Sequence, residues 1–160
     1  MNRALTAAAA GALVVATAGA ALAAIGAHQA SDQQELARVR VQALAAGRQI
    51  AIDLASYDYR TIDRDFTRVS NESTGKFQSD FSTQSAGVRD AIVAEKATST
   101  AQIASAGTVN VSLTSAQVIV ALNRTVTNSQ APKGTNSAFG VQLFLVKRGS
   151  HWLATQVNPL

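Results

Sequence analysis

The chain has no cysteine, and this absence removes several kinds of chemistry at once. Neither a disulfide framework nor a reactive thiol can form, so the folded part must be stabilised by packing. Thiolate ligands for zinc are missing as well, and the two histidines, His28 and His151, lie far apart in the sequence. We therefore expect neither a metal site nor a bound cofactor.

Acidic residues are absent from the later part of the chain. All ten lie at or before Glu95, whereas five basic residues follow that position: Lys96, Arg124, Lys133, Lys147 and Arg148. A surface of one sign favours an anionic partner, such as lipid headgroups or an acidic protein face. The alternative is that five dilute charges only keep a sheet soluble. Nucleic acid is not an expected partner, because these basic residues are neither clustered nor interleaved with stacking aromatic residues.

Charged side chains are also absent from Ala4 to Ala27, directly after Arg3. As a helix, this segment is long enough to cross the hydrocarbon core of a bilayer. We expect an uncleaved single-pass anchor in the cell membrane, with Met1 in the cytoplasm. The alternative is a signal peptide cleaved near Ala21-Leu22-Ala23. The anchor divides the chain into a stub, membrane helix and stem over residues 1–30 and an extracytoplasmic domain over residues 31–160.

Helical periodicity dominates the first part of that domain. Over residues 31–55, apolar side chains recur every three or four positions at Leu36, Val39, Ala43, Ala46, Ile50 and Leu54. A short second helix is expected over Ile62 to Val69, with Thr61 as its N-cap. A third helix, from Lys76 to Lys96, carries a set of apolar residues on one side: Phe77, Phe81, Val88, Ile92 and Val93.

After Lys96 the pattern changes to strands. Alternating residues predict a strand over 108–113, and the apolar run from Val118 to Leu122 predicts a central strand buried on both faces. Two more strands are expected over 139–145 and 151–157, joined by a turn at Gly149-Ser150. Three helices followed by four antiparallel strands form a segregated α+β layout. Such a layout fits a cone-shaped domain in which a curved sheet wraps a long helix.

Three short motifs resemble those of the actinobacterial Mce-associated membrane protein family. The segment from Leu54 to Phe66 (LASYDYRTIDRDF) is similar to the block that follows the first helix in that family. Thr74-Gly75-Lys76-Phe77 is similar to the family's step into its next helix. The last hairpin, Gly149-Ser150-His151-Trp152-Leu153, and the Pro159-Leu160 tail complete the resemblance, which spans nearly the whole chain.

The resemblance implies a nuclear-transport-factor-2-like (NTF2-like) domain behind one membrane helix, acting as an accessory subunit of an Mce-type importer of lipids or sterols. The implied partners are importer subunits, which this domain would bind and stabilise. VirB8-type proteins of secretion systems resemble the same arrangement and provide an alternative, a secretion-system assembly subunit. A third possibility is lipid binding in a cavity lined by Phe66, Phe81, Phe144 and Trp152, although such side chains are more often core.

An enzyme is the least favoured interpretation. Isomerase or dehydratase chemistry on such a fold needs a carboxylate base and a hydrogen-bonding Tyr or His in one pocket. The candidates are Asp53, Tyr57, Asp58, Tyr59 and His151. Asp58 is typical of a turn before a helix, and alternation places His151 and Trp152 on opposite faces of a strand. We therefore expect no catalytic residue.

The candidate site is instead a protein-binding surface. Lys147 and Arg148 lie in the acid-free part of the chain, at the end of a predicted strand. Tyr57 and Tyr59 follow the first helix and offer large amphipathic side chains. We expect these four residues to contact partner subunits.

Overall fold

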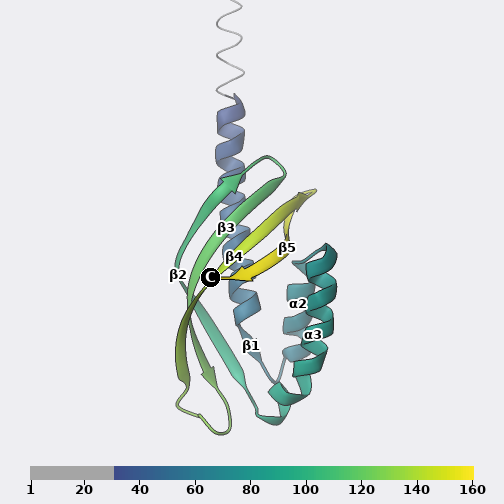
Figure 1. The fold of residues 1–160 in the computed structure, drawn as a ribbon, viewed down its shortest axis with the longest axis vertical. Coiled ribbons are helices and arrows are strands. Elements are labelled where there is room, and N and C mark those ends of the chain that lie inside the picture. The colour runs from purple at the N-terminus through teal and green to yellow at the C-terminus, as the bar shows by residue number, and fades with distance from the viewer. Residues whose placement is uncertain (1–30) are drawn as a thin grey trace, which may run out of the picture. The chain divides into compact units, whose positions relative to one another are not determined.

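The computed structural model describes residues 31–160, of which Arg38–Leu160 form one compact unit. A first helix is described over residues 31–55. It is followed by β1 (Tyr57–Asp58), α2 (Ile62–Asn71), α3 (Gly75–Ala94), β2 (Thr98–Val111), β3 (Ser115–Thr127), β4 (Thr135–Arg148) and β5 (His151–Pro159). Figure 1 shows the long strands curving around the first helix, with α2 and α3 side by side beyond β5. The predicted α+β layout is confirmed.

The apolar stripe of the first helix packs against the inner face of the sheet. Val39, Ala43 and Ile50 are buried there, as the periodicity predicted. Gly47 brings the two layers close together, because a Cβ at that position would meet the Val118 side chain at 2.9–3.0 Å. The core between helix and sheet is therefore filled with side chains, including the fully buried Leu143.

The sheet is an antiparallel meander in the order β1-β2-β3-β4-β5. It has five strands where four were predicted, because Tyr57–Asp58 pairs with the start of β2. β2 begins at Thr98, not near Thr108 as predicted. The inward residues of its first half are the small Ser99 and Ala101, which fit under the end of the first helix but give no apolar alternation in the sequence.

β3 differs from the prediction in its burial. Val118, Val120 and Leu122 are buried, but Ile119 and Ala121 between them are only partly buried. The first helix covers one face of the sheet, whereas the opposite face of this strand stays partly open to solvent. The prediction that this apolar run forms a strand buried on both faces was therefore wrong.

The two later helices differ in part from the prediction. α2 begins after Thr61 as expected, but no hydrogen bond from the Thr61 side chain caps the helix. On α3, Val88 and Val93 are exposed, so the predicted apolar side of that helix is only partly correct. Its aromatic end does pack, with the Phe81 ring edge-on to Phe66 at 5.8 Å between centroids.

The free edge of β5 is held by the link between α2 and α3. The Ala154 amide donates to the Glu72 carbonyl oxygen at 2.9 Å, and the Thr74 amide donates to the Ala154 carbonyl oxygen at 2.9 Å. Gly149, in the turn that precedes β5, has a φ of 61°, which a glycine adopts readily. The predicted Gly149-Ser150 turn is confirmed.

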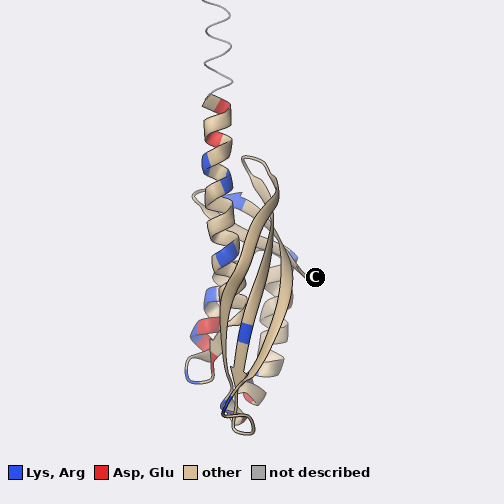
Figure 2. Ribbon diagram, turned by 90° about the vertical axis from the view of Figure 1, so that its left-hand side faces the viewer, with Lys and Arg blue, Asp and Glu red and all other residues tan. Residues whose placement is uncertain are grey.

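Charged residues lie mainly on the helices and the connecting turns, with few along the strands (Figure 2). Among residues 31–160, no helix combines the length and apolar character needed to cross a membrane. The predicted anchor, Ala4 to Ala27, lies outside the described residues.

Candidate functional site

The four residues predicted to bind partners lie at opposite ends of the sheet. Tyr57 pairs with Ser99 where β2 begins, and the Tyr59 amide donates to the Ala97 carbonyl oxygen at 3.1 Å. Lys147 and Arg148 instead close β4 at the far end, where they pair with Trp152 and His151 of β5. The structure therefore separates the predicted contact residues into two surfaces, here called the tyrosine end and the hairpin end.

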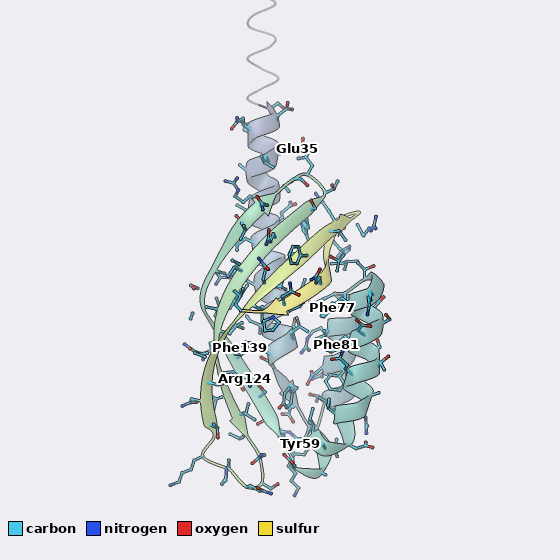
Figure 3. The ribbon with its side chains drawn as sticks, in the orientation of Figure 1. Glu35, Tyr59, Phe77, Phe81, Arg124 and Phe139 are labelled. Atoms are coloured by element: carbon cyan, nitrogen blue, oxygen red, sulfur yellow. The ribbon has the colours of Figure 1, made fainter. Side chains whose placement is uncertain are left out.

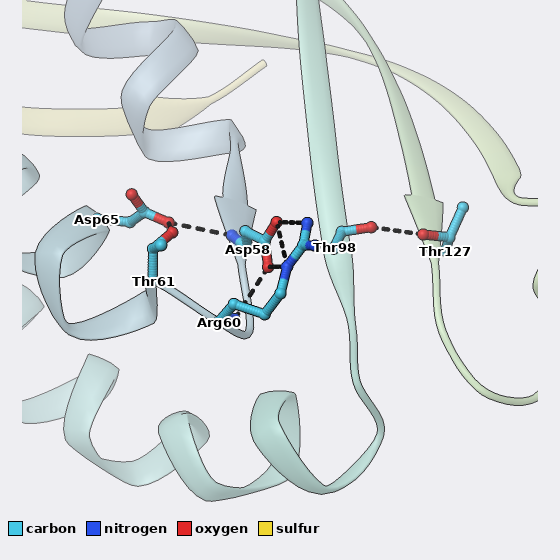
Figure 4. Close-up of polar contacts among 6 residues, drawn as sticks. All are labelled: Asp58, Arg60, Thr61, Asp65, Thr98 and Thr127. Atoms are coloured by element: carbon cyan, nitrogen blue, oxygen red, sulfur yellow. Dashed lines mark hydrogen bonds and ion pairs between the residues drawn. The ribbon is translucent and has the colours of Figure 1, made fainter.

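At the tyrosine end, Asp58 forms a turn, as predicted. Its carboxylate accepts hydrogen bonds from the backbone amide and the guanidinium Nε of Arg60, both at 2.9 Å (Figure 4). The side-chain hydrogen bond from Arg60 is the main reason that the pKa of Asp58 falls to about 2. A carboxylate held so firmly in its ionised form is a poor general base.

Asp65 ties α2 to the same turn. Its Oδ2 atom accepts hydrogen bonds from the Asp58 backbone amide and from the Thr61 hydroxyl, both at 3.0 Å (Figure 4). Thr61 therefore donates forward into the helix instead of capping it, which explains why the predicted cap is missing. Asp65 is 6% exposed and forms the buried centre of this structural joint, whereas Asp58 and Thr61 are partly exposed.

A second charged cluster joins α2 to the first helix. The Arg68 Nε donates to Asp53 Oδ1 at 2.8 Å, and an Arg68 Nη lies 3.3 Å from Asp65 Oδ1. Gln49 donates to the other Asp53 oxygen at 2.7 Å. Asp53, a candidate base in the sequence, is thus fully engaged as a structural ion-pair partner of Arg68.

Glu72 lies next to this cluster, on the side of the hairpin end. Arg68 pairs with Asp53 and Asp65 but forms no ion pair with Glu72. Burial, followed by the negative charge of Asp53, raises the pKa of Glu72 to about 7. Its Oε2 atom is buried and accepts no hydrogen bond from any residue in 31–160, but the protonated Glu72 carboxyl is placed to donate a hydrogen bond to the Asp53 carboxylate. Such unpaired buried atoms are uncommon in folded proteins, so this one marks a place to examine for function.

The hairpin end borders an open groove of about 490 Å³ between the first helix and β5. The helix contributes Gln42, Ala45, Ala46, Gln49 and Ile50, and the opposite wall consists of Asn71, Glu72, Ser150, His151, Trp152 and Leu153. Trp152 is 6% exposed, which confirms its predicted burial. Its Nε1 atom is a second buried polar atom without a hydrogen-bond partner in the described part of the chain.

Arg124 shows that the basic residues of the sheet are not gathered into one patch. Its guanidinium lies over the Phe139 ring at 5.1 Å from the centroid, and Figure 3 shows the two side chains together on the sheet. Lys96 and Lys133 lie outside the strands, in the connections that precede β2 and β4. Lys147 and Arg148 are adjacent in the sequence at the hairpin end, whereas the tyrosine end gathers Arg60, Arg64 and Arg68 around one pocket.

Among the residues that the structure describes, the geometry brings together no acid–base pair of the kind considered above. Asp58 is bound to Arg60, and the exposed His151 ring lies 3.2 Å from the Ser150 hydroxyl at the other end of the sheet. Within residues 31–160, no group of three or more His, Cys, Asp or Glu side chains is placed to hold a metal ion. The described side chains instead form structural joints and line several open pockets, among them one of about 470 Å³ at the tyrosine end beside Tyr57, Arg60 and Arg64.

The fold is similar to that of VirB8-like domains of the NTF2-like type. An IcmL-like type IV secretion system protein from Legionella pneumophila superposes with a TM-score of 0.63 at 14% identity, over 76% of this chain and 93% of that one. CagV from Helicobacter pylori, a VirB8 homologue of a type IV secretion system, superposes with a TM-score of 0.59 at 10% identity, over 72% and 94%. At such identities the likeness concerns the fold alone.

The family is shown by sequence. Residues 4–158 match the family described as "Uncharacterized protein Rv1363c/MT1408-like", so the chain belongs to that family. Rv1363c of Mycobacterium tuberculosis (strain ATCC 25618 / H37Rv) is 27% identical over 132 residues, which cover 82% of this chain and 49% of the relative. The chain thus spans about half the length of that relative. The Mce association expected from the short motifs stays a prediction.

The groove was not predicted from the sequence. Its walls come from three segments, namely residues 42–50, 71–72 and 150–153, and no local pattern joins them. Trp152 was noted as core, but Glu72 belongs to a polar run that resembles an ordinary loop.

Proposed function

We propose that this protein is a non-catalytic assembly subunit of a cell-envelope complex, in which the folded domain binds and stabilises neighbouring subunits. The observation that carries the proposal is the VirB8-like fold, because the similar solved structures are named as type IV secretion system proteins. The state of the polar groups supports it too. The carboxylates considered as bases, Asp53 and Asp58, are engaged by arginines in structural ion pairs.

The class of complex is the finer part of the proposal. The fold favours a secretion-type assembly more directly than an Mce importer, whereas the motif from Leu54 to Phe66 favours the importer. A lipid-carrying cavity has less support, because Ile50, Leu122 and Leu143 fill the space between the first helix and the sheet. We therefore place the protein–protein role first and keep the importer as a specific candidate partner.

The proposed location is the cell membrane, with the domain of residues 31–160 outside the cytoplasm. Anchoring near the bilayer would raise the effective concentration of neighbouring subunits, so a weak interface would be sufficient. N-terminal sequencing of the mature protein tests the anchor. A chain that starts at Met1 or Asn2 supports it, and a start near Ala24 would show a cleaved signal peptide instead.

The test of function is co-purification from native membranes. A tagged full-length chain should recover a defined set of membrane subunits, whose identity separates secretion-type from importer-type complexes. A double charge reversal, Lys147→Glu with Arg148→Glu, should reduce recovery in a salt-sensitive way at equal abundance. Replacing Tyr57 and Tyr59 by Ala tests the other end. If no subunit is recovered with the wild-type chain, the assembly role is wrong.

A further inference from the structure

Two turns lie side by side at the hairpin end, the one between β2 and β3 and the one between β4 and β5 (Figure 1). The Lys147 amide donates to the Thr114 carbonyl oxygen at 2.8 Å, which joins the two turns directly. The strands β3 and β4 that lead out of and into these turns are also neighbours in the sheet. We call the surface formed by residues 112–115 and 147–151 the turn surface.

The β2–β3 turn presents an apolar side chain at its tip. Leu113 is 48% exposed, although turns favour glycine and small polar residues. The turn is held by its own hydrogen bonds, because the Ser112 hydroxyl accepts from the amides of Thr114 and Ser115 at 3.3 and 3.0 Å. Since these amides are satisfied within the turn, they keep their hydrogen bonds when the turn leaves bulk water.

The β4–β5 side of the turn surface is basic. Lys147 and Arg148 form no ion pair within residues 31–160. No acidic residue follows Glu95, so none of the strands β2 to β5 carries one. The acidic residue of the neighbouring groove is Glu72, which is half-buried. The turn surface itself therefore combines two cations with an exposed leucine and attracts negative charge.

The chain enters the domain at this same end. Gln42 of the first helix lines the groove together with Ser150 and His151, so the beginning of the compact unit lies beside the β4–β5 turn. The predicted membrane anchor, Ala4 to Ala27, ends eleven positions before Arg38, where that unit begins. A chain spans at most about 3.6 Å per residue, so Arg38 lies within about 40 Å of the end of the anchor whatever the conformation between them.

We propose that the turn surface contacts the membrane itself, with Leu113 entering the headgroup layer and Lys147 and Arg148 binding anionic lipid headgroups. Apolar side chains beside cations hold a protein surface on an anionic bilayer. The inference rests on the proposed location, since only a domain held near the bilayer reaches it. The tyrosine end lacks this combination, because Asp58 and Asp65 lie among its arginines.

The test uses the absence of cysteine to place one fluorescent label at a time. Thr114→Cys carries the label on the turn surface. Gln130→Cys carries it on the exposed connection between β3 and β4, at the opposite end of the sheet (Figure 1). Full-length protein is reconstituted in vesicles of phosphatidylcholine, with or without phosphatidylglycerol, that contain a lipid with a nitroxide quencher on its headgroup. The label at position 114 should be quenched in the anionic vesicles, less so at high salt, and the label at position 130 should not.

Matched variants test the contribution of charge. In the Thr114→Cys background, Lys147→Glu with Arg148→Glu should lower the quenching to its level in neutral vesicles, because the reversed charges repel anionic headgroups. Lys96→Glu with Lys133→Glu makes the same change in net charge at the other end of the sheet, and it should leave the quenching unchanged.

A second pair of variants tests the apolar tip. Leu113→Ser should reduce the quenching of the label at position 114, because the turn then has no side chain to bury among the lipids. Val88, on α3, is 49% exposed, so Val88→Ser removes an equally exposed apolar side chain from another surface and should have no effect. Both positions are exposed, and circular dichroism verifies that each variant folds.

Three results would overturn the inference, and they differ in what else they reject. If alkaline extraction removes the full-length chain from the vesicles, the proposed membrane location is wrong as well. If the chain stays but the label at position 114 is quenched no more than the label at position 130, the location stands and the lipid contact is rejected. If the reversal of Lys147 and Arg148 lowers subunit recovery from native membranes but leaves the quenching unchanged, the turn surface binds protein instead of lipid.

Discussion

The two ends of the sheet use their polar groups in opposite ways. At the tyrosine end, Asp58 and Asp65 each accept several hydrogen bonds, and the chain turns tightly from β1 into α2. At the hairpin end, Trp152 keeps a buried N–H without a partner, and the buried carboxyl of Glu72 faces the like-charged Asp53 beside an open groove. A polar network in which every group is hydrogen-bonded fixes the structure, whereas a buried polar group without a partner can gain free energy when a ligand supplies one. The carboxylates of the first end therefore have a structural role, and we propose recognition at the second end.

The largest expected effect tests whether Trp152 is an anchor of the hairpin end. Trp152→Ala should lower the free energy of unfolding by about 3–5 kcal/mol, as for other buried aromatic truncations. Denaturant unfolding followed by circular dichroism measures it. Trp152→Phe is the matched control, because it keeps most of the buried ring and removes the unpaired N–H. If both variants lose equal stability, the indole N–H is bonded and the groove has no free donor.

Part of this architecture could be predicted from the sequence and part could not. The stripe of the first helix and the β4–β5 turn follow from local spacing, and both are confirmed. The start of β2 was missed because Ser99 and Ala101 are small inward residues without an apolar signature. The exposure of Val88 and Val93 was missed because helical periodicity identifies a side of a helix but not whether another element covers it.

The candidate site, too, could be predicted from the sequence only in part. The role of Asp58 as a turn residue depends on neighbours within two positions, so the sequence predicted it. The bond from Arg68 to Asp53 joins residues fifteen positions apart on different helices, and it depends on how those helices pack. The groove needs three segments to meet, which only the fold provides.

The second prediction concerns the joint between α2 and the first helix. Arg68→Ala would leave Asp53 and Asp65 buried without their cation and should cost on the order of 2 kcal/mol. The partial exposure of Arg68 keeps the loss below that of a fully buried pair. Arg64→Ala, on an exposed position of the same helix, should change stability by less than about 0.5 kcal/mol. Equal thermal stability of the two variants would contradict the structural role of the cluster.

The third prediction is a pH dependence that originates at the hairpin end. Because the pKa of Glu72 is raised to about 7 in the folded protein, the folded state binds more protons than the unfolded state between about pH 4.5 and 7. Stability should therefore fall as the pH rises through that window. The facing charges are Asp53, which strengthens the effect, and Arg68, which opposes it.

Glu72→Gln keeps the shape of the side chain and removes the titration, so its stability should change less over that window. The difference should be on the order of 1 kcal/mol, well below full conversion of the pKa shift, because Glu72 is only half-buried. Denaturant titrations at pH 5 and pH 7.5 for both proteins measure it. Identical pH profiles would show that Glu72 is hydrated and that its unpaired oxygen contacts water.

The smallest expected effect comes from the residues that a catalytic interpretation would select. Asp58→Asn and His151→Ala, singly and together, should leave the cellular role intact, because Asp58 is bound to Arg60 and His151 is exposed at the opposite end of the sheet. Asp58→Asn should lower stability only slightly, since the turn keeps the amide of Arg60 near a side-chain oxygen and an exposed ion pair contributes little.

The check is complementation of a deletion strain with each variant at matched abundance, followed by recovery of partner subunits. Loss of the cellular role with normal subunit recovery would point to chemistry at these residues. Loss of subunit recovery with Asp58→Asn alone would instead move recognition to the tyrosine end and reverse the division of labour between the two ends.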